Sequence, residues 1–261
     1  MVRQNRTKAK LAAGGAAFGV TVGPNDTDLV EMAGLLGFDF AIVDCEHDLF
    51  NEGALTQVIR AADVHGMTTI ARMQNNSELL LHAVDGGAQG VLAARVNSAE
   101  DARALVDAVK FHPLGKRTIF FRSRGGGYAL DIGSPEQWTL DTNQETMAGC
   151  IIEEITAVNN LAEILELPGI DFIDLGALDM AHSMGWPDQS EVNDLVDKVI
   201  ADSVKAGKAV VTPADVDNIP ALLDKGFRML TVSPRSFFQS GATRFLSRGQ
   251  EVLASKGIPQ V

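Results

Sequence analysis

Short apolar runs alternate along the whole sequence with longer segments whose apolar residues recur at helical spacing. Runs such as Phe40-Ala41-Ile42-Val43 and Ala209-Val210-Val211 are apolar throughout, whereas a strand with one face in water would alternate. Uninterrupted apolar strands are typical of a parallel sheet that is covered on both faces. The predicted strands lie near residues 15–21, 39–44, 68–72, 89–93, 149–153, 171–175, 208–212 and 228–232.

Eight strands separated by helical segments, such as 55–64 and 99–109, predict a closed (β/α)8 barrel that occupies residues 1–261 as a single domain. A doubly wound open sheet is the alternative fold. Its dinucleotide-binding form is disfavoured because no GxGxxG motif follows the first strand.

The N-terminus has the order of charges seen in a signal peptide, because basic residues precede the apolar run 11–23. That run consists mostly of Ala, Gly and Val, however, and Asn5-Arg6-Thr7 is typical of a helix start. The sequence therefore predicts a short first helix followed by the first strand.

Segment 111–147 departs from the regular alternation, since almost 40 residues separate the helix that ends near Lys110 from the fifth strand. Connections of this length are usually functional or disordered. We expect the segment to fold over the barrel mouth, which is the end where the carboxyl ends of the strands meet.

The charge balance narrows the class of partner. Thirty-four acidic and 22 basic side chains give a formal charge of −12, which repels nucleic acid. No stretch of 18 apolar residues predicts a membrane span. The two cysteines, Cys45 and Cys150, form no CxxC motif. A cytoplasmic enzyme that acts on small molecules is the resulting expectation.

Polar residues at the strand ends are the candidates for chemistry, because parallel barrels build their sites there. Asp44 and His47 follow an apolar strand. An Asp three residues before a His can accept a hydrogen bond from the ring and leave its other nitrogen as a base. An ordinary strand-end turn with a solvated His is the alternative. Arg72 ends the next strand, where its planar donors suit a carboxylate or an enolate oxygen.

Glu153 and Asp179 follow the fifth and sixth strands, so their carboxylates can converge. Two carboxylates with open water positions suit Mg²⁺, Mn²⁺ or a similar divalent ion. A pair of acid/base carboxylates, or two unrelated surface charges, would show the same spacing.

Several motifs together carry a family resemblance over nearly the whole chain. They are Gly37-Phe38-Asp39-Phe40 leading to Asp44-Cys45-Glu46-His47, then Arg72, Val84-Asp85-Gly86-Gly87-Ala88, Val96-Asn97-Ser98-Ala99-Glu100-Asp101-Ala102, His112-Pro113-Leu114-Gly115-Lys116-Arg117, Ile152-Glu153, and Gly176-Ala177-Leu178-Asp179-Met180 with Ser183-Met184-Gly185. In this order the sequence resembles the class II pyruvate aldolases of the HpcH/HpaI type.

The resemblance implies a metal-dependent lyase that reversibly cleaves a 4-hydroxy-2-oxo acid to pyruvate and an aldehyde, in the catabolism of aromatic compounds or sugar acids. Glu153 and Asp179 would hold Mg²⁺, Mn²⁺ or Co²⁺, and Arg72 would stabilise the pyruvate enolate. A citrate-lyase-like or decarboxylating enzyme that uses the same site is the alternative. A non-catalytic barrel that binds small acids is a third hypothesis, which the complete set of site residues disfavours.

Further roles are implied for residues around these groups. Asp44 and His47 would act on the C4 hydroxyl, and the backbone amides of Gly176, Ala177 and Leu178 would hold the substrate carboxylate. Asp85 resembles a position that serves the neighbouring subunit, which implies a homo-oligomer, a trimer or hexamer.

The pocket itself departs from the family pattern. Ile151 stands where the family has Gln, and Ala177 where it has Pro. The other departures are Ala94-Arg95 for a Pro, Thr118 for a Gly and Asp48-Leu49 for Gly-Pro. Arg124, with Tyr128 four residues later, fits a spacing that recurs in segment 111–147. We therefore expect Arg124 to bind substrate and to favour acceptors with a second carboxylate. Its alternative role is to pair with a surface acid.

Overall fold

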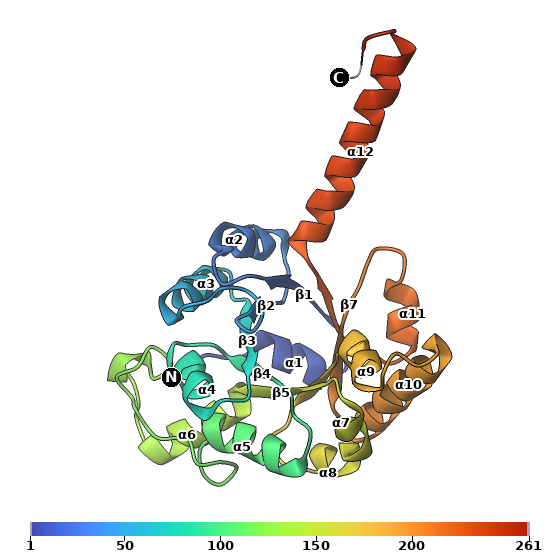
Figure 1. Cartoon of the computed structure of the whole chain (residues 1–261). Coiled ribbons are helices and arrows are strands. Elements are labelled where there is room, and N and C mark those ends of the chain that lie inside the picture. The colour runs from blue at the N-terminus through green and yellow to red at the C-terminus, as the bar shows by residue number, and fades with distance from the viewer. Residues whose placement is uncertain (1, 260–261) are drawn as a thin grey trace.

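In a computed structural model that describes residues 2–259, the strands form one closed barrel in which every neighbouring pair is parallel (Figure 1). The predicted barrel is confirmed, and each predicted strand overlaps an observed one. The strands are β1 Ala17–Val22, β2 Phe40–Asp44, β3 Thr68–Gln74, β4 Gly90–Ala94, β5 Met147–Ile152, β6 Phe172–Leu175, β7 Ala209–Pro213 and β8 Met229–Val232.

Twelve α-helices accompany the strands in residues 2–259, and most of them cover the outside of the barrel. They are α1 Arg6–Ala12, α2 Thr27–Leu36, α3 Glu52–Val64, α4 Ser77–Asp85, α5 Ala99–Val109, α6 Pro135–Glu145, α7 Ile155–Asn159, α8 Leu161–Leu165, α9 Ala177–Ser183, α10 Gln189–Lys205, α11 Ile219–Asp224 and α12 Pro234–Ser255, with a 3-10 turn, η1, at Gly127–Ala129. None of the described helices is long and apolar enough to cross a bilayer.

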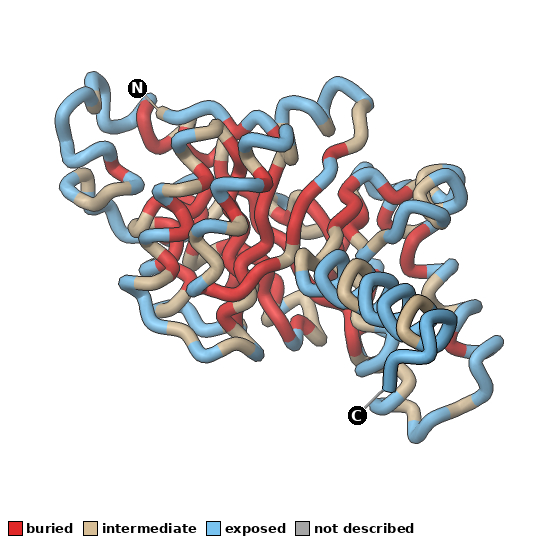
Figure 2. The backbone as a smooth tube through the Cα atoms, turned by 90° about the horizontal axis from the view of Figure 1, so that it is seen from above, coloured by how far each residue is buried: buried red, intermediate tan, exposed pale blue. Residues whose placement is uncertain are grey.

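The strands bury side chains on both faces, as the uninterrupted apolar runs predict. One buried cluster lies between the sheet and the helices, and a second fills the barrel interior. Figure 2 shows that the buried residues are concentrated in the middle of the molecule. Phe40 and Phe172 belong to the interior cluster and are fully buried. Gly19 and Gly149 lie against these two rings, where any side chain would clash. The lower half of the barrel is therefore a closed apolar core.

The predicted first helix, α1, lies across the base of the barrel, at the amino ends of the strands. Asn5 begins it, with Oδ1 accepting from the backbone N–H of Lys8 at 2.9 Å. The same oxygen accepts from the Thr68 hydroxyl at 2.9 Å, and Nδ2 donates to the Glu145 carbonyl at 2.9 Å. The Thr7 hydroxyl donates to the Asp39 carbonyl. One short helix thus ties the beginnings of several strands together.

Helix α12 departs from this arrangement. It projects away from the barrel in Figure 1, and over its 22 residues it buries no side chain. Phe237, Phe238 and Phe245 are 54%, 78% and 78% exposed. In a (β/α)8 barrel the last helix normally packs on the outer face of the sheet beside the final strand. In this chain that face is left without it.

The base contacts predict that Asn5→Ala lowers the free energy of unfolding by roughly 2–4 kcal/mol, since it removes a helix cap and leaves buried partners unsatisfied. Asn76→Ala is the matched control, because Asn76 caps α4 without such buried contacts and should cost only about 1 kcal/mol. Denaturant titration of both variants measures the difference. Equal losses in the two variants would show that the base contacts add nothing beyond the cap.

Candidate active site

The register of the barrel brings the candidate residues of β2 and β3 together at the mouth. Asp44 and Arg72 are paired residues of these neighbouring strands. Arg72 donates through Nε to Oε2 of Glu46 at 3.2 Å, and its Nη1 lies 3.8 Å from Oδ2 of Asp44. Glu46 is 8% exposed, so its carboxylate is held almost entirely within the protein. The guanidinium is therefore fixed by two acids while 22% of the side chain remains accessible.

His47 lies at the rim of this site with 65% of its side chain exposed. The expected hydrogen bond from its ring to Asp44 is wrong for this structure. Asp44 accepts instead from the backbone N–H groups of Glu46 and His47, both at 3.1 Å, which closes a tight turn after β2. The ring has Nε2 at 3.6 Å from Oε2 of Glu46. Asp44 thus shapes the turn that carries His47, and Glu46 lies between the imidazole and Arg72.

Glu153 follows β5 directly and is 8% exposed. Its Oε1 accepts from the backbone N–H of Arg95 at 2.8 Å, and Arg95 takes a φ of 57°, an uncommon value for a residue with a side chain. Burial raises the pKa of Glu153; the Arg95 N–H lowers it, and the charges of Glu46 and Asp179 raise it further. The strained turn after β4 therefore directs the Arg95 N–H at the Glu153 carboxylate. The charged form of this carboxylate is destabilised by its acidic neighbours, Glu46 and Asp179.

Asp179 lies in the first turn of α9, and Gly176 precedes that helix. A side chain at 176 would collide with Cβ of Glu153, so the missing side chain lets the loop approach the carboxylate. Ala177 and Leu178 are found at the start of the same helix, with Leu178 exposed. The segment from Gly176 to Asp179 thus lies beside Glu153, as predicted for residues that follow neighbouring strands of a parallel barrel.

The sequence analysis missed Asp174, in β6. It follows the inward-facing Phe172 by two residues, so it also faces the barrel interior. Its hydrogen-bond partner is the backbone N–H of Leu175, at 2.8 Å. Burial raises the pKa of Asp174 to about 6, against the opposing effects of that N–H and of Arg72, and Glu153 adds to the rise. A charged residue at an inward position of a buried strand was the available signal.

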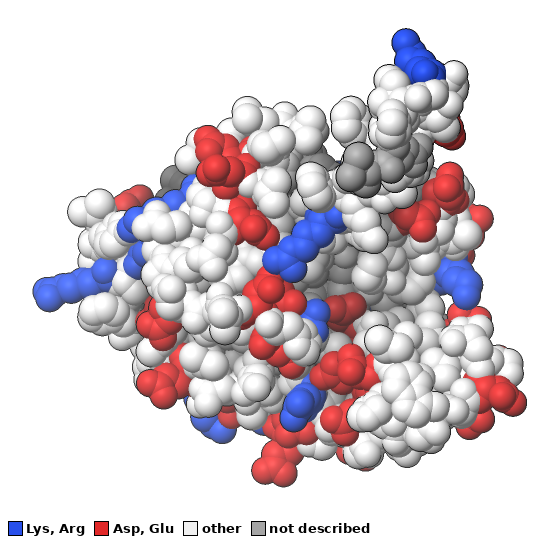
Figure 3. Space-filling view, turned by 45° about the horizontal axis from the view of Figure 1, so that its top comes forward, with Lys and Arg blue, Asp and Glu red and all other residues white. Residues whose placement is uncertain are grey.

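The charges at the mouth are strongly unbalanced. Asp44, Glu46, Glu153 and Asp174 all lie close enough to Arg72 for an ion pair or an electrostatic effect. Figure 3 shows acidic side chains gathered with a few basic ones around a hollow on the face it presents. Repulsion among buried carboxylates is relieved by a bound cation. The electrostatics of this site therefore favour a positively charged ligand.

The donor set fits a hard divalent cation that keeps several positions open. Among residues 2–259, no three His, Cys, Asp or Glu side chains converge as a ready set of metal ligands. Glu153 and Asp179 would supply two carboxylates, and Mg²⁺ is commonly held by one or two carboxylates with waters or substrate in the other positions.

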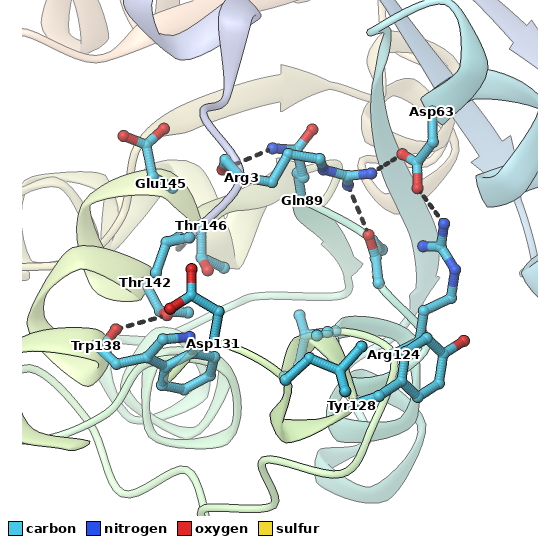
Figure 4. Close-up of a pocket in the computed structure, with 18 of the residues that line it drawn as sticks. Arg3, Asp63, Gln89, Arg124, Tyr128, Asp131, Trp138, Thr142, Glu145 and Thr146 are labelled. Atoms are coloured by element: carbon cyan, nitrogen blue, oxygen red, sulfur yellow. Dashed lines mark hydrogen bonds and ion pairs between the residues drawn. The ribbon is translucent and has the colours of Figure 1, made fainter. Parts of the chain in front are cut away.

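Arg124 does not lie at the mouth of its own barrel, so the expectation that segment 111–147 covers this mouth is wrong. Arg124 and Arg3 both pair with Asp63, at the end of α3 near the barrel base (Figure 4). The Gly125 N–H donates to the carbonyl of Asp85. These contacts hold the segment against the amino end of β4, beside a cavity of about 320 Å³. The alternative role of Arg124, pairing with an acid, is the observed one.

Asp85 itself ends α4, on the side away from the mouth. Its Oδ1 lies 2.6 Å from Nη2 of Arg117, whose side chain is 3% exposed. Asp85 therefore takes no part in the mouth of its own subunit, and its role toward a neighbouring subunit stays a prediction.

Comparison with known proteins gives a family model, HpcH/HpaI aldolase/citrate lyase, that matches residues 18–246. The chain belongs to this family. It is 30% identical over 215 residues to the 2-keto-3-deoxy-L-rhamnonate aldolase of Klebsiella pneumoniae, which covers 78% of this chain and 77% of that relative. It is 29% identical over 231 residues to the 2-dehydro-3,6-dideoxy-6-sulfogluconate aldolase of Pseudomonas putida, with 86% of each chain covered.

The crystal structure of an HpcH/HpaI aldolase from Desulfitobacterium hafniense superimposes with a TM-score of 0.85 and 25% identity, over 94% of this chain and 96% of that one. Together with the two aldolase relatives, the family match makes this chain a carbon–carbon lyase. Its predicted membership and enzyme class are confirmed.

Ile151, which departs from the Gln that the resemblance implies, lies beside Asp174. The two are paired residues of β5 and β6, and Ile151 is 3% exposed in the interior cluster. An acidic side chain thus lies one strand away from the apolar Ile151.

The raised pKa of Asp174 predicts a pH-dependent stability. An acid that ionises near 6 when folded and near 3.8 when unfolded destabilises the fold as pH rises through that window. Asp174→Asn should therefore be more stable than wild type by on the order of 2–3 kcal/mol above pH 7. The gain should vanish near pH 4. Denaturant unfolding with chelator present measures it, and a pH-independent difference would rule out ionisation of Asp174 as its cause.

Proposed function

We propose that the chain is a divalent-metal-dependent aldolase that reversibly cleaves a 4-hydroxy-2-oxo acid to pyruvate and an aldehyde. The observation that carries the proposal is Arg72, fixed by Glu46 and Asp44 beside the buried Glu153. The names of the two aldolase relatives describe 2-oxo acids that lack the C3 hydroxyl. We extend that substrate class to this chain.

The residues supply complementary functions around such a substrate. Glu153 and Asp179 would hold the cation, which acts as a Lewis acid on the oxo-acid end when bound. Arg72 places a fixed positive charge where the keto oxygen becomes negative as the C3–C4 bond breaks. The backbone of Gly176 to Leu178 lies beside Glu153 and would receive the substrate carboxylate.

His47 would take the proton from the C4 hydroxyl. Its exposed position at the rim suits a group that acts on the end of the substrate that enters and leaves as the aldehyde. Asp44 holds the turn that presents His47, and Oε2 of Glu46 lies 3.6 Å from Nε2 of the ring. The proton therefore leaves on the solvent side of the cleaved bond.

Metal removal tests the proposal directly. Treatment with a chelator should abolish pyruvate release from 4-hydroxy-2-oxo acids, and Mg²⁺, Mn²⁺ or Co²⁺ should restore it. Glu153→Gln removes one charged ligand and should weaken metal affinity about 10–100-fold or more, which isothermal titration measures. Full activity in excess chelator after dialysis would refute metal dependence.

Arg72→Lys should lose on the order of 100-fold or more in kcat, because an ammonium cannot reproduce two planar donors at one oxygen. The same variant should bind the divalent ion as wild type does, which separates loss of the donor from loss of the metal. A near-wild-type kcat would place Arg72 outside the reaction.

We further propose a homo-oligomer in which α12 packs on a second copy. The uncovered outer face beside β1 and β8 forms an apolar cavity of about 300 Å³. Its lining includes Phe18, Leu36, Phe38, Val216, Ile219 and Leu230. The position is the one that the last helix of a barrel fills, and the last helix of this chain buries none of its side chains.

Light scattering should therefore find an oligomer and no stable monomer. Phe238→Glu and Phe245→Glu together should dissociate it, because two charges would enter an apolar contact. Lys198→Glu, on the exposed surface of α10, is a charge-changing control. An active monomer of the wild-type chain would refute the proposal.

A further inference from the structure

A cavity of about 370 Å³, the base cavity, lies at the opposite end of the barrel from the proposed active site. Helix α1 borders it on one side, and the amino ends of β5 to β8 border it on the other. Its charged lining residues are Lys8, Asp171, Lys208 and Arg228. Three cations and one acid therefore border a single cavity in a chain whose formal charge is −12.

The barrel brings these charges together because the amino ends of parallel strands meet at the base. Asp171, Lys208 and Arg228 directly precede β6, β7 and β8, which are neighbours in the sheet. Backbone hydrogen bonds continue the sheet at these positions. The Ala209 N–H donates to the Asp171 carbonyl at 3.3 Å, and the Arg228 N–H donates to the Val210 carbonyl at 3.2 Å. The spacing of the charges is therefore set by the barrel itself.

Asp171 cannot neutralise the cations around it. Its Oδ1 lies 2.7 Å from Nζ of Lys8, and its Oδ2 lies 3.2 Å from Nζ of Lys110. The same Oδ2 accepts from the Ala148 backbone N–H at 2.8 Å. Lys110 is only 1% exposed, so its positive charge is held inside the protein. One carboxylate thus serves two ammonium groups, and the other two cations of the lining have no share in it.

Lys208 and Arg228 keep donors for a ligand. Nζ of Lys208 donates to the Ile170 carbonyl at 2.8 Å, and an ammonium has further donors beyond this one. Nη1 of Arg228 donates to the carbonyls of Leu223 and Phe227 at 2.9 and 2.8 Å. Within the described part of the chain, Nε and Nη2 of Arg228 have no hydrogen-bond partner, and neither cation forms an ion pair. Carbonyl contacts thus hold both cations in place without neutralising them.

The unused donors suit an oxyanion. Nε and Nη2 of Arg228 are two planar donors that match two oxygens of one carboxylate or phosphate, and an ammonium adds a point charge beside them. The volume lies within the range of small-molecule sites, about 300–1,000 Å³. Leu11 and Met147 add an apolar wall. The lining therefore fits a small molecule that carries two negative charges.

We propose that the base cavity binds a small dianion, a phosphate group or a dicarboxylate, through Lys8, Lys208 and Arg228. The bound anion supplies the negative charge that Asp171 alone does not provide. It also fastens α1 to the amino ends of β7 and β8, because its contacts come from all three elements. A ligand that binds only the folded chain stabilises it. The proposal is independent of the aldolase reaction, since the cavity lies at the other end of the barrel.

Isothermal titration of the metal-free, full-length chain with inorganic phosphate or malonate tests the proposal, with KCl holding the ionic strength constant. Saturable binding is expected, and the tighter of the two probes identifies the class of anion. Lys208→Met and Arg228→Met should each weaken it about 10-fold or more, since each removes a charged hydrogen bond. Lys198→Met removes the same charge from the exposed surface of α10 and should bind as wild type does.

Amide hydrogen exchange measures the fastening of α1. Saturating phosphate or malonate should slow exchange in residues 6–12 of the wild-type chain and leave it unchanged in Lys208→Met. If circular dichroism shows that Arg228→Met is unfolded, Lys208→Met and Lys8→Met decide the outcome.

The proposal is overturned if neither probe binds saturably, or if Lys198→Met weakens binding as much as Lys208→Met does. Binding that Arg72→Ala abolishes and Lys208→Met retains would place the anion at the mouth and would also overturn it. Unchanged exchange in α1 at saturation would refute the fastening.

Discussion

The closed register of the parallel barrel is the constraint on which the site depends. Each strand is hydrogen-bonded to two neighbours, so a shift by one residue would turn its inward side chains outward. That register pairs Asp44 with Arg72 and Ile151 with Asp174. The residues at the mouth therefore owe their positions to apolar packing lower in the barrel, where Phe40 and Phe172 fill the space left by glycines. A rigid core fixes the charges above it.

The electrostatic character of the mouth follows from this arrangement. The carboxylates near Arg72 cannot move apart, because they are attached to adjacent strand ends and one of them accepts a backbone N–H from the strained turn at Arg95. Their repulsion follows from the fold itself and is lowered when a cation binds. Because this repulsion is built into the fold, the site favours ligands of positive charge, whatever their shape.

The fold could be read from the sequence because strand and helix periodicities are local. The strand-end rule likewise located Arg72, Glu153 and Asp179, since position along a strand decides which end of the barrel a residue occupies. The contacts of the His47 ring could not be predicted in this way. Asp44 accepts hydrogen bonds from backbone N–H groups of the turn, and the His47 imidazole lies near Glu46 instead. Local backbone geometry determines this arrangement. Asp174 was missed because it lies within a short apolar run, and the whole run was assigned to a strand without a site residue. Arg124 was misplaced because a long connection does not reveal to which end of the barrel it returns.

Helix α1 also imposes an order of events on the folding chain. Its contacts reach far along the sequence, from Asn5 to Glu145 and from Lys8 to Asp171. Residues 5–8 are thus synthesised long before the residues that they contact. At typical translation rates the chain beyond Lys8 must grow for on the order of ten seconds before Asp171 exists. During that time the amino end of the growing sheet has no cover, and the nascent protein depends on local βα units to stay compact until the base can close.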